Sequence, residues 1–453
     1  MEKVCLVSLG CAKNLVDSEM MLGFLKKDGF GFSTEPSESE IIVVNTCGFL
    51  EASRKESIEQ ILEMARYKEE GVCKVLVASG CLTQKHGEEL AKEMPEVDLF
   101  IGTGEFDRLA EYLRKRFASP PPRSPSLIRR GKGEVVLSAR QILPDPDLPR
   151  ILSTPKHYSY VKISEGCSHI CSFCTIPSIR GRLKSRTLDS VVREVEQFVV
   201  QGVKEFNLIA QDLNEYGRDL KDGTNLAALI EALDKVPGDF WLRPLYMYPL
   251  EFNDRLITAL ADSEHAVKYV DMPLQHISER VLLSMKRGSP GRYVRQVLGK
   301  LKARIPELAL RTTFIVGYPG ETEEEFQELC DFVSETEFDR VGVFKFSIEE
   351  GTAAATLPDQ VPQETKDERY ERLMALQMKI SRKKNKALVG KTFKALCEGP
   401  MPGNSGFFQA RLASQAPEID GITLLAGQHK AGEFVNVKIL KTADYDLIAE
   451  ASA

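Results

Sequence analysis

The sequence predicts an α/β multidomain protein with three folded parts. Short apolar runs alternate with amphipathic stretches over the first 118 residues, which is typical of a parallel sheet covered by helices. The same alternation resumes from about Tyr158 over a span long enough for a βα barrel. After residue 386 the pattern changes to short strands with Gly and Pro turns. The length of 453 residues also exceeds what one hydrophobic core usually organises.

The first part, residues 1–118, is expected to be an α/β domain with a largely parallel sheet. Its elements in order are a strand at 4–10, a helix at 17–30, a strand at 40–48, a helix at 57–71 and a strand at 74–81. The stretch SPPPRSP, residues 119–125, permits neither a helix nor a central strand, so a Pro/Arg-rich linker is expected over 119–152. Seven basic residues and no acidic one lie between Arg114 and Gly133, and such a block favours a solvated linker over a phosphate-binding segment.

The second part, residues 153–385, is expected to form a full or partial βα barrel of the TIM type. About six strands are each followed by a helix or a turn, with strands at 158–164, 205–212, 240–249, 267–274, 310–320 and 339–347. In such barrels the chemistry lies at the carboxyl ends of the strands. A charged helix over 364–388 then leads to the third part, 386–453, which is expected to be a small antiparallel β-barrel.

Composition narrows the class of protein. Hydrophobic residues make up 43% and charged residues 28%, and no apolar run reaches the length of a membrane span. The start MEKVCLVSLG lacks a secretory signal, so we expect a cytoplasmic protein with no membrane partner. A net charge of -6 does not indicate binding of nucleic acid by bulk electrostatics. Ten cysteines without an export signal indicate thiols that bind metals or lie in cores, rather than disulfides.

Three cysteines follow the first strand of the central part, in the stretch EGCSHICSFCTIPSIRG. Cys167, Cys171 and Cys174 form a CxxxCxxC spacing, and no fourth cysteine lies nearby. A four-iron cluster usually takes one thiolate per iron, so three cysteines leave one iron open to a substrate or cofactor. The alternatives are cysteines buried by chance, or a zinc ion whose fourth ligand is a histidine such as His169. The spacing and the loop position favour the cluster.

A second set of three cysteines lies in the N-terminal domain, each just past the carboxyl end of an apolar strand. Because parallel sheets gather their ligands outside these strand ends, Cys11, Cys47 and Cys81 are expected to meet and to hold a second cluster with an open iron. The adjacent Gly10, Gly48 and Gly80 would let the backbone turn sharply there. The other four cysteines are predicted to be core residues: Cys5, Cys73, Cys330 and Cys397.

The CxxxCxxC loop after a barrel's first strand, with Phe173 just before the last cysteine, resembles the radical S-adenosylmethionine superfamily. The resemblance implies that the open iron binds S-adenosylmethionine and that the reduced cluster cleaves it to methionine and a 5′-deoxyadenosyl radical. Together with the two flanking domains, essentially the whole chain resembles the radical S-adenosylmethionine methylthiotransferase family. The third domain then looks like the TRAM domain of that family. All six cysteines, Cys11, Cys47, Cys81, Cys167, Cys171 and Cys174, become predicted metal ligands and catalytic residues of two 4Fe-4S clusters.

Three stretches resemble the ribosomal-protein branch of this family more than its tRNA branch: SLGCAKNLVDSE at 8–19, IPSIRGRLKSR at 176–186 and QAPEIDG at 415–421. The resemblance implies a methylthio transfer to the β-carbon of an aspartate in small-subunit ribosomal protein twelve, either free or within the ribosome. The alternative is a transfer to adenosine beside the anticodon of a tRNA. Residues 386–453 carry seven basic and seven acidic residues, so a neutral domain with an acidic PEIDG edge suits a basic ribosomal protein better than a tRNA.

The resemblance also implies a division of labour between the clusters. The N-terminal cluster holds the sulfur, which one S-adenosylmethionine methylates, and the barrel cluster cleaves a second S-adenosylmethionine. The radical removes hydrogen from the aspartate β-carbon, and this carbon then attacks the methylthio sulfur while the N-terminal cluster takes up the surplus electron. A cellular reductant must supply the barrel cluster. A different class of function is an iron–sulfur electron carrier or RNA-binding assembly factor with structural clusters, in which S-adenosylmethionine would not be cleaved.

Strand-end residues of the central part are candidates for holding the cofactor. Gln211 and Asp212 are placed to hold the amino group of S-adenosylmethionine, and Arg243 its carboxylate or the substrate aspartate. The remaining candidates are Phe173 before the last cysteine, Gln275 beside His276, and Ile315 with Gly317 against the adenine. For each polar residue the alternative is a strand-end hydrogen bond within the fold.

Overall fold

The computed structural model describes residues 2–118, 133–404 and 406–452, and the chain divides into two compact units. The first unit comprises Met1–Ser153, Lys162–His169 and Cys174–Arg186. The second comprises Thr154–Val161, Ile170–Phe173 and Thr187–Ala453. The first unit therefore contains the N-terminal domain with two short segments around the CxxxCxxC loop, and the second contains both barrels.

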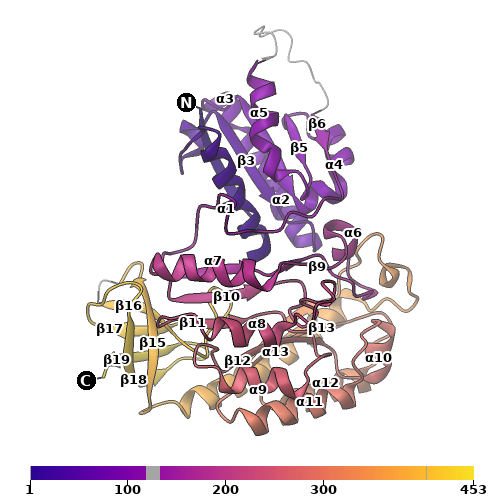
Figure 1. Ribbon diagram of the computed structural model, residues 1–453. Coiled ribbons are helices and arrows are strands. Elements are labelled where there is room, and N and C mark those ends of the chain that lie inside the picture. The colour runs from indigo at the N-terminus through magenta and orange to yellow at the C-terminus, as the bar shows by residue number, and fades with distance from the viewer. Residues whose placement is uncertain (1, 119–132, 405, 453) are drawn as a thin grey trace. The chain divides into compact units, whose positions relative to one another are not determined.

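The first unit is built on a six-stranded parallel sheet in the order β2-β1-β3-β4-β5-β6, as the sequence predicted (Figure 1). The strands are β1 (Lys3–Ser8), β2 (Gly31–Phe32), β3 (Ile41–Thr46), β4 (Val75–Gly80), β5 (Leu99–Ile101) and β6 (Glu134–Val136). The helices are α1 (Ala12–Lys27), η1 (Pro36–Glu38), α2 (Glu51–Ala65), α3 (Tyr67–Glu70), α4 (Cys81–Glu93), η2 (Phe106–Arg108) and α5 (Leu109–Ala118).

Helices cover both faces of this sheet, and the central strands are therefore buried throughout. Successive residues of a strand point to opposite faces, so Ile41 and Val43 pack with α1 and α5, while Ile42 and Val44 pack with α2 and α4. The first unit thus has two apolar layers, one on each side of the sheet.

One short stretch within the predicted linker, residues 119–152, is a strand instead. Glu134–Val136 pairs in parallel with Leu99–Ile101 and forms the sixth strand of the sheet. Three isolated residues after a proline-rich stretch carry too little periodicity to reveal a strand, and the neighbouring strand selects them. The proline-rich stretch itself, residues 119–132, lies outside the described residues.

The barrel of the central part is built from six strands in two three-stranded sheets, β11-β10-β7 and β12-β13-β14, with a parallel bridge between Leu242 and Ala266. This confirms the predicted partial βα barrel. Its strands are β7 (Tyr158–Lys162), β10 (Glu205–Ile209), β11 (Trp241–Pro244), β12 (Tyr269–Gln275), β13 (Ala309–Val316) and β14 (Arg340–Lys345). Its helices are α7 (Leu188–Val200), α8 (Leu226–Leu233), α9 (Asp254–Asp262), α10 (Glu279–Ser284), α11 (Gly291–Arg304), α12 (Glu323–Thr336), η3 (Ala353–Thr356) and α13 (Gln363–Lys386).

Local capping residues fix where several of these helices begin. The side chains of Thr187, Asn225, Asn253 and Ser278 each accept the backbone N–H three residues further on, which satisfies a donor that the first turn leaves open. At α12, Thr322 and Glu325 form a reciprocal capping box. Five of the six barrel strands, all except β14, therefore pass into a helix that begins at a capped residue.

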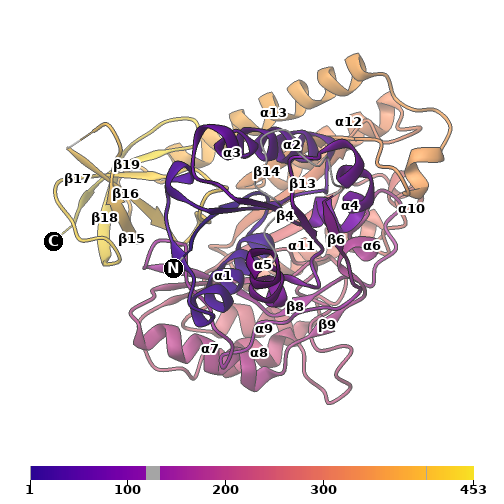
Figure 2. The same ribbon diagram turned by 90° about the horizontal axis from the view of Figure 1, so that it is seen from above.

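The C-terminal part is a closed five-stranded barrel in the order β15-β16-β17-β19-β18. Its strands are β15 (Thr392–Pro400), β16 (Phe407–Leu412), β17 (Thr423–Ala426), β18 (Phe434–Thr442) and β19 (Leu447–Ala451). The predicted antiparallel pairing is confirmed except at one place, because β17 and β19 pair in parallel. The helix α13, which leads into this barrel, packs beside α12 and β14 (Figure 2).

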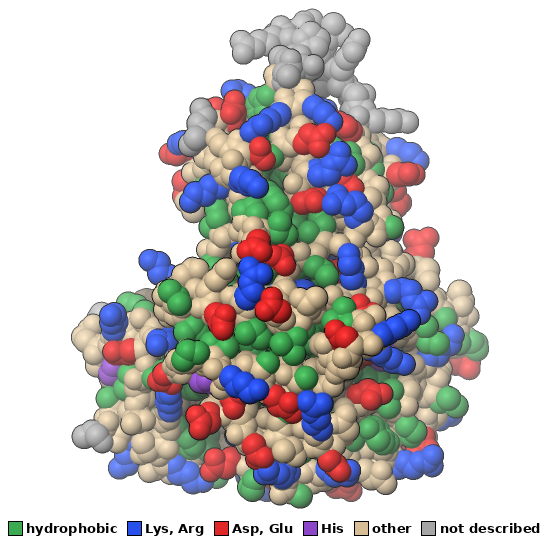
Figure 3. Space-filling model, viewed as in Figure 1, with side chains coloured by type: hydrophobic (Ala, Val, Ile, Leu, Met, Phe, Trp, Pro, Cys, Tyr) green, Lys and Arg blue, Asp and Glu red, His purple; other side chains and the backbone are tan. Residues whose placement is uncertain are grey.

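The CxxxCxxC stretch contributes a short antiparallel pair and one short helix to the first unit: β8 (Ser164–Glu165), β9 (Lys184–Ser185) and α6 (Ile176–Arg180). In the part of the chain that the structure describes, every helix is too short or too polar to cross a membrane. On the face drawn in Figure 3, Lys and Arg side chains are interspersed with Asp and Glu, which accords with the modest net charge of -6.

Candidate functional site

The three N-terminal cysteines lie at the same edge of the parallel sheet. Cys11 precedes the first residue of α1, Cys47 follows the last residue of β3, and Cys81 begins α4 directly after β4. These strands are neighbours, with Ser8 paired to Asn45 and Thr46 paired to Gly80. The carboxyl ends of the three strands therefore bring the three thiols to one place, as the sequence predicted.

The adjacent glycines allow the three cysteine loops to touch. A Cβ on Gly10, whose φ is +86°, would lie 2.7 Å from Cys47 Cβ and 3.0 Å from Cys47 Sγ. A Cβ on Gly80, whose φ is +98°, would lie 2.4 Å from Asn45 Oδ1. At Gly48 the neighbour is the backbone of α4, because an added Cβ would lie 2.7 Å from Leu82 Cα. Three converging thiols with backbone this close fit a cluster that takes three ligands from the protein.

The three thiols lie in unequal electrostatic surroundings. Burial raises the pKa of Cys81 to about 12 and also raises the pKa of Cys47. Desolvation acts in the same direction on Cys11, but the charges of Lys13 and Arg180, with backbone N–H donors, lower its pKa overall. Without a metal ion, Cys81 therefore keeps its proton, and metal binding must displace it.

A group of buried charges lies against Cys81. Arg180, at the end of α6, donates from Nε to Cys81 Sγ at 3.3 Å and from Nη1 to Asp17 and Glu165 at 3.0 Å each. Lys162 bonds the same two carboxylates, with Nζ 2.8 Å from Glu165 Oε2. The stretch IPSIRG alone predicts no role for Arg180, since nothing local indicates a partner almost a hundred residues away.

The CxxxCxxC loop is held by contacts of each cysteine. The backbone N–H of Cys167 donates to the carbonyl of Gly181 at 3.1 Å, and Cys174 Sγ accepts from the backbone N–H of Ile176 at 3.5 Å. In the second unit, Cys171 Sγ lies 3.8 Å from Nη1 of Arg287. The three side chains are partly exposed, as ligands of an added group must be.

Ser172, between the second and third cysteines, anchors the loop to the barrel. Its Oγ lies 3.0 Å from the carbonyl of Ser284 and 2.8 Å from the hydroxyl of Tyr318, and its backbone N–H donates to the carbonyl of Met285. The loop therefore follows β7 with a fixed backbone. This is the predicted position, after the barrel's first strand.

Phe173 and Ile315, both predicted to contact the cofactor, belong to one apolar cluster. They pack against the buried side chains of Tyr318, Phe346 and Val281. Their partial exposure at the end of this cluster suits contact with an adenine ring.

Gly317 lies next to this apolar cluster. Its φ is +71°, and a Cβ there would lie 2.3 Å from Lys366 Cγ. Its backbone N–H donates to the carboxylate of Glu321 at 3.0 Å. The glycine is thus needed for close approach of α13 as well as for the turn.

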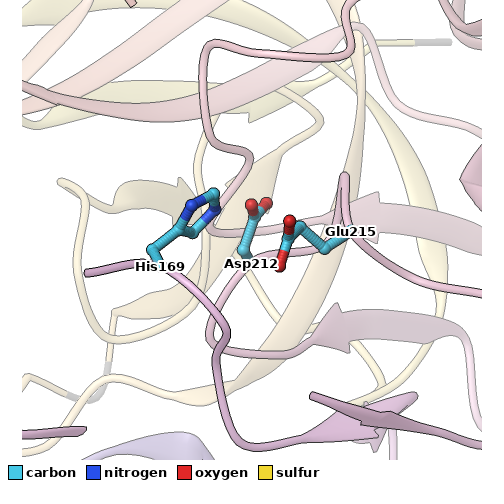
Figure 4. A group of neighbouring side chains, drawn as sticks. All are labelled: His169, Asp212 and Glu215. Atoms are coloured by element: carbon cyan, nitrogen blue, oxygen red, sulfur yellow. The ribbon is translucent and has the colours of Figure 1, made fainter. Parts of the chain in front are cut away.

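Asp212 lies on the loop after β10 and is almost fully buried. Its Oδ1 accepts the backbone N–H groups of Asn214 at 2.8 Å and Tyr248 at 3.2 Å. Its carboxylate lies within 4.8 Å of that of Glu215, and Figure 4 shows these two side chains beside each other. The preceding Gln211 is partly exposed. Sequence reasoning missed Glu215.

Gln275 ends β12 at a β-bulge and has a φ of +72°. A non-glycine residue in this conformation stores strain, and such strain is commonly found at functional sites. Next to it, His276 is fully buried, with Nδ1 accepting the backbone N–H of Ser278 at 3.0 Å. Its Nε2 lies 3.5 Å from Glu321, which also binds Arg369 at 2.7 Å. Glu321 therefore organises this end of the barrel, and sequence reasoning missed it.

The prediction for Arg243 is wrong. Its side chain is fully buried, where Nε donates to Glu205 at 2.7 Å and Nη1 donates to the carbonyl of Ala413 in the C-terminal barrel at 2.7 Å. The guanidinium also lies over the ring of Tyr269. These contacts direct Arg243 toward the packing of the two barrels rather than toward a cofactor.

The predicted acidic docking edge PEIDG is wrong for Asp420. The carboxylate of Glu418 accepts the hydroxyls of Tyr158 at 2.9 Å and Tyr160 at 3.2 Å. The side chain of Asp420 is fully buried, accepts the hydroxyl of Tyr269 at 2.8 Å and lies 3.8 Å from Arg311. Asp420 therefore does not belong to an acidic edge, whereas Glu418 is an exposed residue whose carboxylate also accepts two tyrosine hydroxyls.

The four cysteines predicted as core residues, Cys5, Cys73, Cys330 and Cys397, are all buried. Burial raises the pKa of Cys73, of Cys330 and of Cys397 to about 11 each. This prediction is confirmed.

Family models match all three folded parts. Residues 3–102 match the uncharacterized protein family UPF0004, residues 161–333 match the radical SAM superfamily and residues 389–451 match the TRAM domain. Membership of the radical SAM superfamily implies a 4Fe-4S cluster and S-adenosylmethionine. The TRAM match accords with the closed C-terminal barrel.

Solved structures support the fold. The radical S-adenosylmethionine methyltransferase TsrM from Kitasatospora setae, with cobalamin and a 4Fe-4S cluster bound, aligns with a TM-score of 0.56 at 16% identity, covering 78% of this chain and 77% of that chain. The cobalamin-dependent S-adenosylmethionine radical enzyme OxsB aligns with a TM-score of 0.52 at 13% identity, covering 84% of this chain and 56% of that chain. At this identity the likeness concerns the fold alone.

Relatives with curated names resemble the chain over nearly its whole length. The ribosomal protein uS12 methylthiotransferase RimO of Pelobacter propionicus is 46% identical over 450 residues, 99% of this chain and 98% of that protein. The protein of the same name from Geotalea uraniireducens is 46% identical over 452 residues, again 99% and 98%. These names do not favour the tRNA alternative. The chain therefore belongs to the RimO family of radical SAM methylthiotransferases and is an enzyme of that class.

Proposed function

We propose that the enzyme adds a methylthio group to the β-carbon of an aspartate in ribosomal protein uS12, using two 4Fe-4S clusters and two molecules of S-adenosylmethionine. The observation that carries the proposal is the presence of two separate sets of three cysteines. Cys11, Cys47 and Cys81 meet at one edge of the N-terminal sheet, and CxxxCxxC follows the barrel's first strand. The substrate rests on the names of the relatives.

The chemistry requires cleavage of an unactivated C–H bond, which acid and base groups do not accomplish at neutral pH. When bound, a cluster with an open iron and S-adenosylmethionine supply the radical that this step needs. The protein contributes the ligands and the surroundings. Cys167, Cys171 and Cys174 would hold one cluster, and Cys11, Cys47 and Cys81 the other.

The barrel residues have distinct tasks in this proposal. Phe173 and Ile315 offer apolar surface to the adenine, and Gly317, whose φ is +71°, turns the backbone beside them. Asp212 offers a carboxylate to the amino group of S-adenosylmethionine, with Gln211 beside it. Gln275 would hold the remaining polar edge of the cofactor, and its strained backbone fixes that side chain at the strand end.

The proposal needs a cellular reductant for the clusters and places the enzyme in the cytoplasm, where ribosomal proteins are made. Reductive cleavage of S-adenosylmethionine consumes an electron, so an electron donor is the required partner.

The test is mass spectrometry after anaerobic turnover of the reconstituted full chain with S-adenosylmethionine, sulfide and a reductant. The protein is offered both uS12 and unmodified tRNA. A methylthio mass on the aspartate peptide alone is the expected result. A methylthio adenosine in the tRNA digest instead would refute the substrate, and absence of 5′-deoxyadenosine would refute the radical reaction and leave the electron-carrier function.

Two cysteine variants sharpen this test. Cys47→Ala removes a proposed ligand and should abolish the methylthio product. Cys73→Ala is the matched control, because Cys73 lies in the same unit but is buried in the core with its thiol directed at the carbonyl of Val75. Equal product from both variants would contradict the role of the N-terminal set.

A further inference from the structure

We propose that Arg180 is a positioning residue that sets the reduction potential of the N-terminal cluster through the hydrogen bond from its Nε to Cys81 Sγ. This inference rests on the proposed function, since it requires that Cys11, Cys47 and Cys81 hold a cluster. It assigns a task to a residue that lies outside both sets of cysteines.

The contacts of Arg180 leave its guanidinium little freedom. The side chain is only 2% exposed, and each edge of the planar group has a partner. Nη1 donates to Asp17 Oδ2 and Glu165 Oε2 at 3.0 Å each, and Nη2 donates to Asn14 Oδ1 at 3.3 Å. Because the donors of arginine form a rigid fork, these bonds hold the Nε–H group toward Cys81.

Asn14 connects this arginine to the other two cysteine loops. Its Nδ2 donates to the carbonyl of Leu9 at 2.7 Å and to that of Thr46 at 3.3 Å. Leu9 lies two residues before Cys11, and Thr46 lies one residue before Cys47. One amide therefore orients the guanidinium while holding the loops that present the other two thiols.

The buried charges around Arg180 sum to zero. Arg180 and Lys162 carry two positive charges, and Asp17 and Glu165 carry two negative charges, all on side chains that are almost completely buried. A buried group of this kind contributes little net stability compared with apolar packing of the same volume. Within the described contacts of Arg180, the bond to Cys81 is the one that reaches a proposed metal ligand.

The backbone of the same segment contacts the CxxxCxxC loop. Arg180 lies six residues after Cys174, and the carbonyl of the next residue, Gly181, accepts the N–H of Cys167 at 3.1 Å. Gln141 fixes this segment by donating from Nε2 to the carbonyls of Arg180 at 2.7 Å and Arg182 at 2.5 Å. The segment thus supports one cysteine set through its side chain and the other through its backbone.

Hydrogen bonds to cluster sulfurs are among the factors that set cluster potentials. An N–H donor lowers the energy of the more negatively charged, reduced state more than that of the oxidised state. Removing the donor should therefore make reduction harder. We expect the equilibrium constant for one-electron reduction to fall about tenfold, which corresponds to a midpoint about 59 mV more negative.

The experiment measures this midpoint by an EPR-monitored redox titration of the full chain, reconstituted anaerobically with iron and sulfide. The barrel cysteines are replaced (C167A, C171A and C174A), so only the N-terminal cluster contributes. Arg180→Lys keeps the positive charge but loses the rigid Nε–H donor. The double variant R180M with E165Q also loses the donor, and it keeps the net charge because one positive and one negative charge are removed together. It replaces Arg180→Lys in the titration if that variant does not fold.

Arg411→Lys is the matched control. Arg411 is as deeply buried as Arg180, but its contacts end on the carboxylates of Glu205 and Glu398 and on the carbonyl of Gln415. A shift to a more negative midpoint in both Arg180 variants, with an unchanged midpoint in Arg411→Lys, is the expected result. An unchanged midpoint in an Arg180 variant with full iron content would overturn the inference.

The two proposals fail in different ways. If the parent with replaced barrel cysteines binds no cluster, the proposed two-cluster function is wrong. If it binds a cluster whose midpoint does not depend on Arg180, the proposed function stands and only the role of Arg180 is wrong.

Discussion

At the scale of single residues, two glycines with the same backbone conformation have different tasks. Gly10 and Gly29 both have a φ of +86°. No atom lies within 4 Å of where a Cβ on Gly29 would be, whereas a Cβ on Gly10 would lie 2.7 Å from Cys47 Cβ. The conformation alone explains Gly29, but Gly10 is also required for contact between two loops that carry proposed ligands.

Gly10→Ala is therefore expected to lose much of the iron at the N-terminal site, because the new methyl group must displace Cys47. Gly29→Ala shares the left-handed strain, roughly 1–2 kcal/mol, but meets no neighbour. Both variants should show a lower thermal midpoint, and only Gly10→Ala should also bind less iron, measured per chain after reconstitution. Full iron content in Gly10→Ala would show that the loops have more room than the structure indicates.

At the scale of elements, the periodicity of the sequence was sufficient for the parallel N-terminal sheet, the six barrel strands and the strand-end positions of the cysteines. Periodicity was insufficient where a residue distant in the sequence determines whether a strand forms or where a side chain points. The short strand β6 forms only because β5 is beside it. Arg243 lies in a strand at the expected place, yet Glu205 and the C-terminal barrel direct its side chain. Arg180 meets Cys81 through the tertiary fold, which no local pattern encodes.

The pairing of β15 with β16 makes a testable contribution to acid stability. Glu398 on β15 accepts from Arg411 Nε at 2.6 Å and Gln409 Nε2 at 2.8 Å, and His157 Nε2 lies 3.6 Å away. Although burial opposes it, His157 and Arg411 lower the pKa of Glu398 from 4.5 to about 2. The stabilisation is therefore fully present above pH 4.5 and is lost as the pH falls toward 2.

Glu398→Gln should remove this dependence, which amounts to about 3 kcal/mol across that window. The free energy of unfolding, measured from pH 6 down to the acid limit of folding, should fall less steeply in this variant than in the parent. Glu450→Gln, at an exposed acidic position of the same barrel, is the control and should retain the parental slope. Identical slopes for Glu398→Gln and the parent would mean that other carboxylates dominate acid unfolding.

At the scale of the whole molecule, the C-terminal barrel is built into the second unit. Glu205 of β10 is fully buried between two arginines, Arg243 from the central barrel and Arg411 from the C-terminal barrel. Breaking a buried pair by removing one partner costs roughly 3–5 kcal/mol, because the other charge is left uncompensated. The third domain is thus a fixed part of the second unit rather than a tethered arm.

A substitution of Asp420 distinguishes a structural role of its carboxylate from a role in binding the ribosomal protein. If its carboxylate holds the barrels together through Tyr269 and Arg311, Asp420→Asn should destabilise the protein by roughly 2–3 kcal/mol and leave the KM for uS12 unchanged. Thermal unfolding and steady-state turnover of the same preparation measure both quantities. Glu450→Gln, an exposed acidic position on the same barrel, should change neither. A raised KM at an unchanged thermal midpoint in Asp420→Asn would instead restore the view that this acidic stretch receives the basic ribosomal protein.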